Sequence, residues 1–190
     1  MNRMLSLGIA LVAVGALFVG SRQGSAQATA GGKTATAELK PSKNAATMPA
    51  NKNVTGTVTF TDAGGGKVKV SAHIMGLAPN TEHGFHIHAS GDLSDPGLMS
   101  TGGHFNPTNH IHGGPTTSPV HAGDMGNIKA DATGMAMLDL TLEGISIGTG
   151  AADDIVGKAV IVHGAPDDLK SQPAGNAGPR VAGGVIELKK

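Results

Sequence analysis

The sequence predicts an all-β protein, an antiparallel sandwich or barrel of about eight short strands. Apolar and polar residues alternate in short runs, and turns rich in glycine and proline separate these runs. After the N-terminal 28 residues, no segment repeats its apolar residues with the period of an amphipathic helix. The 30 glycines suit a fold with many tight turns.

The N-terminal residues have the three-part layout of a secretory signal peptide. Arg3 supplies a positive charge, residues 4–20 form an apolar run, and residues 26–28 (Ala-Gln-Ala) read as a cleavage site. The run is close to the shortest length that spans a membrane, so an uncleaved anchor is the alternative interpretation. We expect residues 1–28 to be removed. The mature domain, residues 29–190, is then exported to the periplasm or the cell exterior without stable membrane association.

Residues 29 to about 53 read partly as a flexible lead-in that contains the first strand. The expected strands are residues 34–39, 54–61, 68–74, 81–88, 127–131, 135–142, 157–163 and 181–188. Two long irregular connections, residues 89–126 and 164–179, join some of them. Long loops on a β-scaffold commonly carry function.

Composition limits the chemistry that the chain can use. There is no cysteine, so disulfides and thiolate ligands are excluded, while seven of the nine histidines lie between His83 and His121. The leader contains two of the 14 basic residues and none of the 14 acidic ones, so the net charge of the mature domain is near −2. A domain without excess positive charge gives no reason to expect nucleic-acid binding.

His86 and His88 lie two residues apart in an expected strand. Side chains at this spacing point to one face, while Ile87 between them points to the other face, toward the core. Two neutral imidazoles side by side can chelate one metal ion; a pair of surface histidines is the alternative. His163 ends the apolar run 159–163 and could complete this centre, which suits copper or zinc. A structural histidine is the alternative there.

A second ligand set follows in the first long connection. His104, His112, His121 and Asp124 are spaced by eight, nine and three residues, with turn-forming residues between them. Three imidazoles and one carboxylate suit a tetrahedral zinc ion, and the set leaves no open position for a substrate. The pattern therefore indicates a structural zinc site.

Five motifs occur in a defined order along the chain. They are Gly-Phe-His-Ile-His at 84–88, Gly-Gly-His-Phe-Asn-Pro at 102–107, His-Gly-Gly-Pro at 112–115, His-Ala-Gly-Asp-Met-Gly-Asn at 121–127 and Gly-Asn-Ala-Gly-Pro-Arg at 175–180. On these motifs, the chain from about Thr34 onward resembles the Cu/Zn superoxide dismutases. The resemblance implies an immunoglobulin-like Greek-key sandwich or barrel. It also implies conversion of superoxide to oxygen and hydrogen peroxide, with copper cycling between Cu(II) and Cu(I).

The resemblance also assigns the site residues. Copper would be bound by His86, His88, His104 and His163, and zinc by His104, His112, His121 and Asp124. His104 would bridge both metals, and would hold and return a proton. Asp167 would fix one histidine of each metal by hydrogen bonds. Arg180, the only arginine of the mature chain, would attract the anionic substrate.

The chain also departs from the family. The positions of the family's intraloop disulfide correspond here to Leu98 and Gly183, and we expect apolar contacts of Leu98 and Met99 to hold the loop instead. Zinc would order it further. The family's steering lysine is missing, and Lys170 is the candidate replacement. His73, His83 and His110 are expected to lie outside the ligand set.

Two function classes follow from these expectations. A superoxide dismutase needs Arg180 and an open copper face. The alternative, a non-catalytic protein that binds or stores copper or zinc, needs neither. Members of the family dimerise through different surfaces, so a homodimer is an expectation to which the sequence assigns no surface.

Overall fold

The computed structural model describes residues 32–190, so the predicted signal peptide lies outside the described residues. This part of the chain forms eight strands: β1 (Thr34–Pro41), β2 (Thr55–Gly64), β3 (Lys67–Met75), β4 (Glu82–His88), β5 (Asp124–Lys129), β6 (Ala136–Glu143), β7 (Ala159–His163) and β8 (Arg180–Leu188). Its helices are three short 3-10 helices: η1 (Lys43–Thr47), η2 (Pro49–Asn51) and η3 (Met99–Thr101). None of the helices within residues 32–190 has the length and apolar character needed to cross a membrane.

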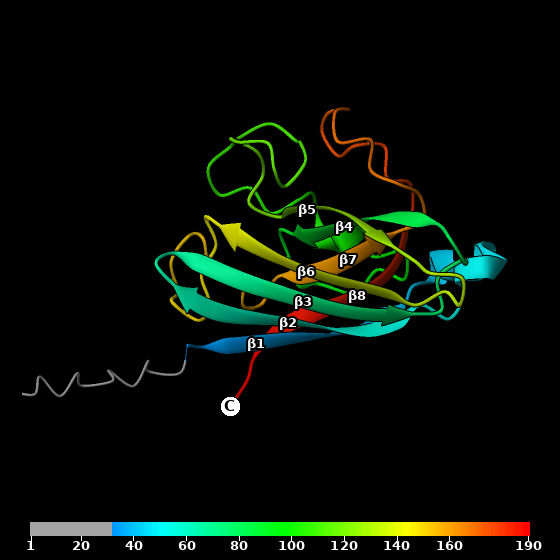
Figure 1. Cartoon of the computed structure of the whole chain (residues 1–190), viewed down its shortest axis with the longest axis horizontal. Helices are drawn as coiled ribbons and strands as arrows, with labels where there is room; N and C mark the ends of the chain where they lie inside the picture. The colour runs from blue at the N-terminus through cyan, green and yellow to red at the C-terminus, as the bar shows by residue number, and fades with distance from the viewer. Residues whose placement is uncertain (1–31) are drawn as a thin grey trace, which may run out of the picture. The chain divides into compact units, whose positions relative to one another are not determined.

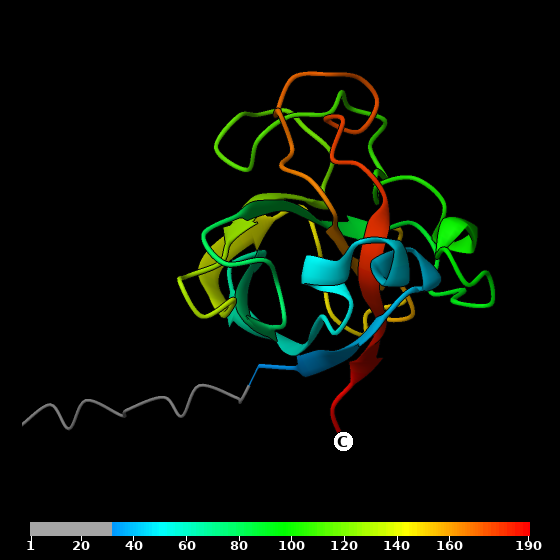
Figure 2. The same ribbon diagram turned by 90° about the vertical axis from the view of Figure 1, so that its right-hand side faces the viewer.

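All strand pairs are antiparallel and follow the order β5-β4-β7-β8-β1-β2-β3-β6. β8 pairs with both β7 and β1, so it joins the two halves of the sheet. The sheet curls into a nearly closed barrel, which Figure 2 shows end-on. The two outer strands approach each other where Ala130, just after β5, bridges to Ala136. The predicted all-β fold of eight antiparallel strands is confirmed.

The apolar residues of the alternating pattern that predicts the strands also form the core. Along β3 every second residue is buried and the residues between them are exposed. Phe60, Ile74, Phe85 and Ile87 are among the fully buried side chains. Burying a side chain of this size contributes about 1.5–3 kcal/mol to the stability of the fold. The packed barrel therefore supports the loops on its surface.

The two long connections project from the same side of the barrel, over β4, β5 and β7 (Figure 1). They also contact each other. The Gln172 side chain donates to the backbone carbonyl of His112 (2.9 Å) and accepts from the backbone N–H of the same residue (2.8 Å). The loops therefore cover one face of the barrel together.

Most strand boundaries differ from the prediction by one to three residues; β2, for example, extends to Gly64 instead of ending at residue 61. β5 begins at Asp124, three residues before the predicted strand, because Asp124 pairs in register with His86 of β4. Part of the predicted flexible lead-in forms η1 and η2. The Ser42 hydroxyl caps η1 by accepting from the backbone N–H groups of Asn44 and Ala45.

Candidate metal centre

The strands place the first group of histidines. His86 and His88 lie on β4 and His163 ends β7, the neighbouring strand. Ile87 is fully buried in the core, as predicted from the alternation. The two histidines of β4 point to the opposite face and are buried as well, because the long loops cover that face.

His86, His88, His104 and His163 form the first cluster, in which four ring nitrogens lie within 4.8 Å of one another. The outer nitrogen of two of these rings is held by the backbone. His88 Nδ1 lies 2.9 Å from the Gly102 carbonyl oxygen, and His163 Nδ1 lies 3.1 Å from that of Gly178. Since a carbonyl only accepts, each Nδ1 carries the proton. Two lone pairs, on His88 Nε2 and His163 Nε2, therefore face each other at 3.3 Å, as expected of ligands around a cation.

His104, His112, His121 and Asp124 form the second cluster, again with the candidate ligand atoms within 4.8 Å. Asp124 Oδ1 lies 2.7 Å from His104 Nδ1 and 3.3 Å from His121 Nδ1, and Oδ2 lies 3.0 Å from His112 Nδ1. Burial raises the pKa of Asp124. Hydrogen bonds from His104 and the Gly113 N–H outweigh this effect, so its pKa lies below the usual value and it is an anion at neutral pH.

His104 belongs to both clusters because its two nitrogens face different ways. Nδ1 contacts Asp124, while the buried Nε2 has no hydrogen-bond partner among the described residues. The His104 ring centroid lies 4.0 Å from that of His86 and 5.5 Å from that of His121. One imidazole thus joins the two clusters.

Asp167 connects the clusters a second time. Its Oδ2 lies 2.7 Å from His86 Nε2 and its Oδ1 lies 3.0 Å from His112 Nε2. Both contacts are buried, and each fixes which nitrogen of its histidine faces the cluster. The backbone of Asp167 is itself held by Asn127, whose side chain exchanges two hydrogen bonds with it (2.7 and 2.9 Å).

Gly175 lies directly against this network. Its φ is +66°, in the left-handed region that favours glycine, and an added side chain would collide with the Asp167 carboxylate and His112. Asn127, Gln172 and Gly175 are not among the predicted site residues, although the motifs at 121–127 and 175–180 include the first and the last of them. Only their contacts in the folded chain reveal what they hold.

The donor set fits metal cations. His86 Nδ1, His104 Nε2 and His112 Nδ1 are buried and lack a hydrogen-bond partner among residues 32–190, which is unfavourable unless a ligand satisfies them. Burial lowers the pKa of His86 and His88 well below the usual value, and lowers that of His163 to about 4. Neighbouring histidines lower the pKa of His86 and His88 further. The rings of His86, His88 and His163 are therefore neutral near pH 7, the form that binds metal.

A cavity of about 270 Å³ opens beside the first cluster and is lined by His163 and Arg180. Arg180 is half-buried and its guanidinium is fixed by three acceptors. It donates to the carbonyl of Leu98 (2.5 Å), to the Thr101 hydroxyl (2.9 Å) and to the carbonyl of Gly102 (2.7 Å). Among the described residues that line this cavity, Arg180 is the one with a permanent charge, and Lys170 does not line it.

Leu98 holds the first long loop to the barrel. It is buried against Ala159 and Ile161, and its Cδ1 would lie 3.0 Å from a Cβ atom added to Gly183. Met99 behaves differently from the expectation: its side chain is 64% exposed, so the apolar anchor is Leu98 without Met99. Asn44 of η1 adds polar contacts, because its amide donates to the carbonyls of Gly97 (3.2 Å) and Arg180 (3.3 Å).

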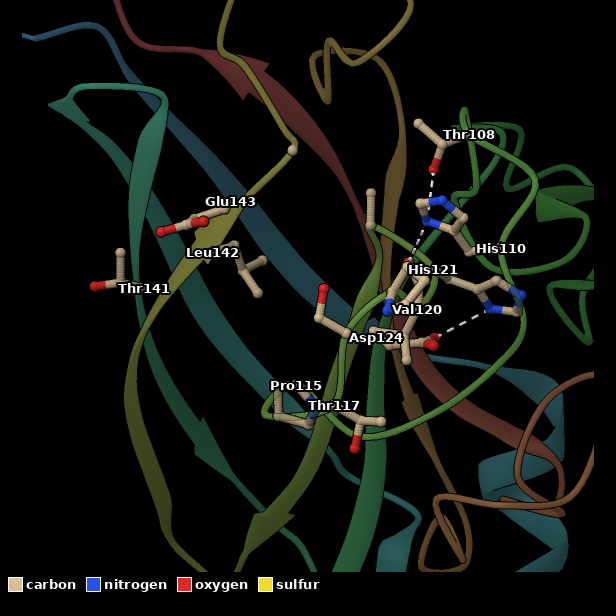
Figure 3. Close-up of a pocket in the computed structure, with 14 residues that line it drawn as sticks. Thr108, His110, Pro115, Thr117, Val120, His121, Asp124, Thr141, Leu142 and Glu143 are labelled. Atoms are coloured by element: carbon tan, nitrogen blue, oxygen red, sulfur yellow. Dashed lines mark hydrogen bonds and ion pairs between the residues drawn. The ribbon is translucent and has the colours of Figure 1, made fainter.

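The other histidines lie outside both clusters. His83 is buried and bonded to the Thr81 hydroxyl and the His163 carbonyl. His110 is exposed at the rim of a second cavity of about 420 Å³, with its Nδ1 3.0 Å from the Thr108 hydroxyl (Figure 3). The same cavity reaches His121 and Asp124 of the second cluster.

The fold and the site define a β-barrel protein with two buried, histidine-rich clusters that share one imidazole. Comparison with known families is consistent with this class, because residues 54–186 match the family described as copper/zinc superoxide dismutase (SODC). The match covers more than half of the chain, so the chain belongs to the copper/zinc superoxide dismutase family. A similar solved structure is the crystal structure of the clock protein EA4. It is 39% identical, and the match covers 83% of this chain and 96% of that chain with a TM-score of 0.72.

Proposed function

We propose that the protein is a superoxide dismutase, with copper bound in the first cluster and zinc in the second. The observation that carries the proposal is Arg180, a fixed cation at the cavity beside the first cluster. Two superoxide ions and two protons give one dioxygen and one hydrogen peroxide. One superoxide loses the electron that the other gains. Bound copper would supply this one-electron chemistry.

The chain's own residues set up the encounter with the substrate. Arg180 attracts the anion, since its charge is permanent and its planar fork is held in place by the loop carbonyls. A locally positive cavity raises the on-rate of a small anion by tenfold or more, even on a chain without net positive charge. His163 pairs with Arg180 in the strand register, and both residues line the same cavity. In the proposal, the anion therefore binds next to His163.

His104 carries out the proton step in the proposal. Its Nε2 is buried and makes no hydrogen bond with the described residues, so this nitrogen would be the atom that holds and returns a proton. Asp124 at Nδ1 keeps the ring in place meanwhile. Asp167 keeps the rings of His86 and His112 in position, so the site needs little rearrangement between the half-reactions.

The alternative function is metal storage without catalysis. The same two clusters would serve it, and a family match alone does not decide between the two. A store has no use for an anchored arginine beside an open cavity. The placement of Arg180 therefore favours the enzyme.

The deciding experiment combines metal analysis with superoxide consumption. We expect the wild-type protein to bind copper and zinc and to consume superoxide. Arg180→Ala should keep both metals and lose about tenfold or more of the rate, and Arg180→Lys should recover part of it. The matched control is Lys170→Ala, an exposed cation outside the cavity, which should change the rate little. Full copper loading without superoxide consumption would establish the storage function instead.

Export is proposed from the N-terminal residues. The leader layout of residues 1–28 supports it, and the mature protein should begin at Thr29. Mass spectrometry of the protein from its native source measures this directly. A chain that still begins at Met1 would contradict removal of the leader and favour the membrane anchor. The homodimer also stays a prediction, which sedimentation of the purified protein would test.

A further inference from the structure

Three exposed methionines and one exposed histidine gather on the outer surface of the barrel, on β3 and β6. β3 turns His73 and Met75 outward, because the buried residues of this strand alternate with them. Met137 is an outward residue of β6, and Met135 precedes that strand. Met75, Met135 and Met137 are 45%, 36% and 72% exposed.

The strand register brings these four residues together. His73 lies opposite Met137, and Ile74 lies opposite Ala136. Met75 and Met135 adjoin this last pair along the two chains, and the backbone N–H of Leu77 donates to the Gly134 carbonyl, so the chains stay close beyond it. Directly opposite residues have Cβ atoms about 5 Å apart, and residues two apart along a strand are separated by roughly 7 Å. His73 and Met137 are therefore neighbours across the two strands, and Met75 and Met135 adjoin them on the same outer face.

Methionine side chains are unbranched and flexible, so their sulfur atoms can turn toward the imidazole of His73. The neighbouring outward residues are polar: Ser71 and Asp139 form the next cross-strand pair, and Thr57 lies beside His73 on β2. Asp139 is diagonal to His73 and supplies a negative charge near the cluster. Figure 1 shows β3 and β6 side by side along the barrel wall. Three of the four residues thus lie on paired strands, and Met135 lies in the turn that leads into β6.

Three thioethers and one imidazole have a specific metal preference. Thioether sulfur is a soft, uncharged ligand that selects Cu(I) over hard divalent ions. The chain contains no cysteine, so methionine is its only soft sulfur ligand. Exposed apolar side chains add little to the packing of the core, so the stability of the barrel does not require methionine at these positions.

We propose that His73, Met75, Met135 and Met137 form a binding site for Cu(I), separate from the two histidine clusters. The site binds the ion without changing its oxidation state, so no electron moves. It does not depend on the proposed reaction, since it shares no residue with either cluster. It gives the protein a place to take up monovalent copper on its surface.

Silver(I), a redox-inert ion with the same preference for sulfur, is the probe. Protein already loaded with zinc and copper is labelled with ¹³C in the methionine methyl groups and titrated with silver nitrate. The methyl signals of Met75, Met135 and Met137 should shift together and saturate at one equivalent. The signals of Met48, Met99 and Met125 should stay in place. Silver bound by the histidine clusters would instead shift Met99, which lines the cavity with His163, or Met125, which follows Asp124, and would leave the three surface signals in place. That result would contradict the proposal.

Variants and Cu(I) complete the test. In competition with a Cu(I) chelator under anaerobic conditions, Met137→Leu and His73→Gln should each weaken binding at least tenfold. Met99→Leu, which removes an exposed methionine elsewhere, should not. The proposal is overturned if the three methyl signals do not respond to silver, or if Met137→Leu binds Cu(I) as tightly as the wild type. The methyl shifts are read on the wild-type protein, so they decide the matter even if a variant folds poorly.

Discussion

Asp167 shows how one residue can govern two sites. Its two carboxylate oxygens bond to histidines of different clusters, His86 and His112, and all of these atoms are buried. Each bond directs the other ring nitrogen, His86 Nδ1 or His112 Nδ1, to its cluster, where it makes no hydrogen bond with the described residues. Loss of Asp167 therefore frees both rings at once.

Replacing Asp167 by alanine should weaken the binding of both metals by about 10–100-fold each, because both rings lose their fixed orientation. Titration of the metal-free protein with copper and zinc against chelators of known affinity measures the change. Asp139→Ala, on the outer face of β6, is the matched control and should bind both metals as the wild type does. Weakened binding of one metal alone would contradict the double role.

At the scale of elements, the first long loop is held from several sides. Leu98 packs on β7 and approaches Gly183 of β8, while η1 contributes Asn44. The carbonyls at the end of this loop are also the acceptors of Arg180. The apolar anchor and the position of the substrate-attracting cation are therefore coupled.

Leu98→Ser should lower the free energy of unfolding by about 2–5 kcal/mol, since a buried leucine is truncated and a hydroxyl is buried in its place. The rate of superoxide consumption should fall as well, because the carbonyls that hold Arg180 move. Thermal unfolding and activity assays measure the two effects. Met99→Ser, next to it but exposed, should leave the melting temperature within about one degree. An unchanged melting temperature in Leu98→Ser would show that the loop is held without this anchor.

The sequence predicted the strands because each has a local signal, alternation bounded by turn residues. The 3-10 helices η1 and η2 were not predicted, because elements of three to five residues are too short to show a period. The start of β5 was placed three residues late because it depends on pairing with His86 and not on the residues of β5. Local sequence patterns thus identify the strands, whereas pairing with neighbouring strands determines where each strand begins and ends.

The residues of the two histidine clusters could be predicted from the sequence about as well as the strands. The histidine spacings and motifs pointed to the residues that the structure brings into two clusters. The exposed side chain of Met99 and the neighbours of His73 could not be predicted. His73 and Met137 are separated by more than sixty positions in the chain, and only the β3–β6 register makes them adjacent.

At the scale of the whole molecule, the buried neutral histidines make folding depend on pH. Burial lowers the pKa of His163 from 6.5 to about 4, so below pH 6.5 the unfolded chain binds a proton that the folded chain does not. Stability is therefore fully present above pH 6.5 and is lost as the pH falls toward 4. His86 and His88 act in the same direction, since their pKa is lowered further.

The metal-free protein should accordingly lose about 3 kcal/mol through His163 between pH 6.5 and 4. Denaturant unfolding at a series of pH values measures this loss. His163→Gln should show a shallower dependence, while His73→Gln, at an exposed position, should keep the wild-type slope. Equal slopes in all three proteins would show that His163 is not the group responsible.

The contact between Leu98 and Gly183 has a consequence for how the protein matures. The chain has no thiol to oxidise, so its loop reaches the final position without forming a disulfide and needs neither a thiol oxidase nor a disulfide isomerase. Thiol reductants have no target in it and should leave its melting temperature unchanged. Closure of this loop should therefore not depend on the redox state of the compartment in which the protein folds.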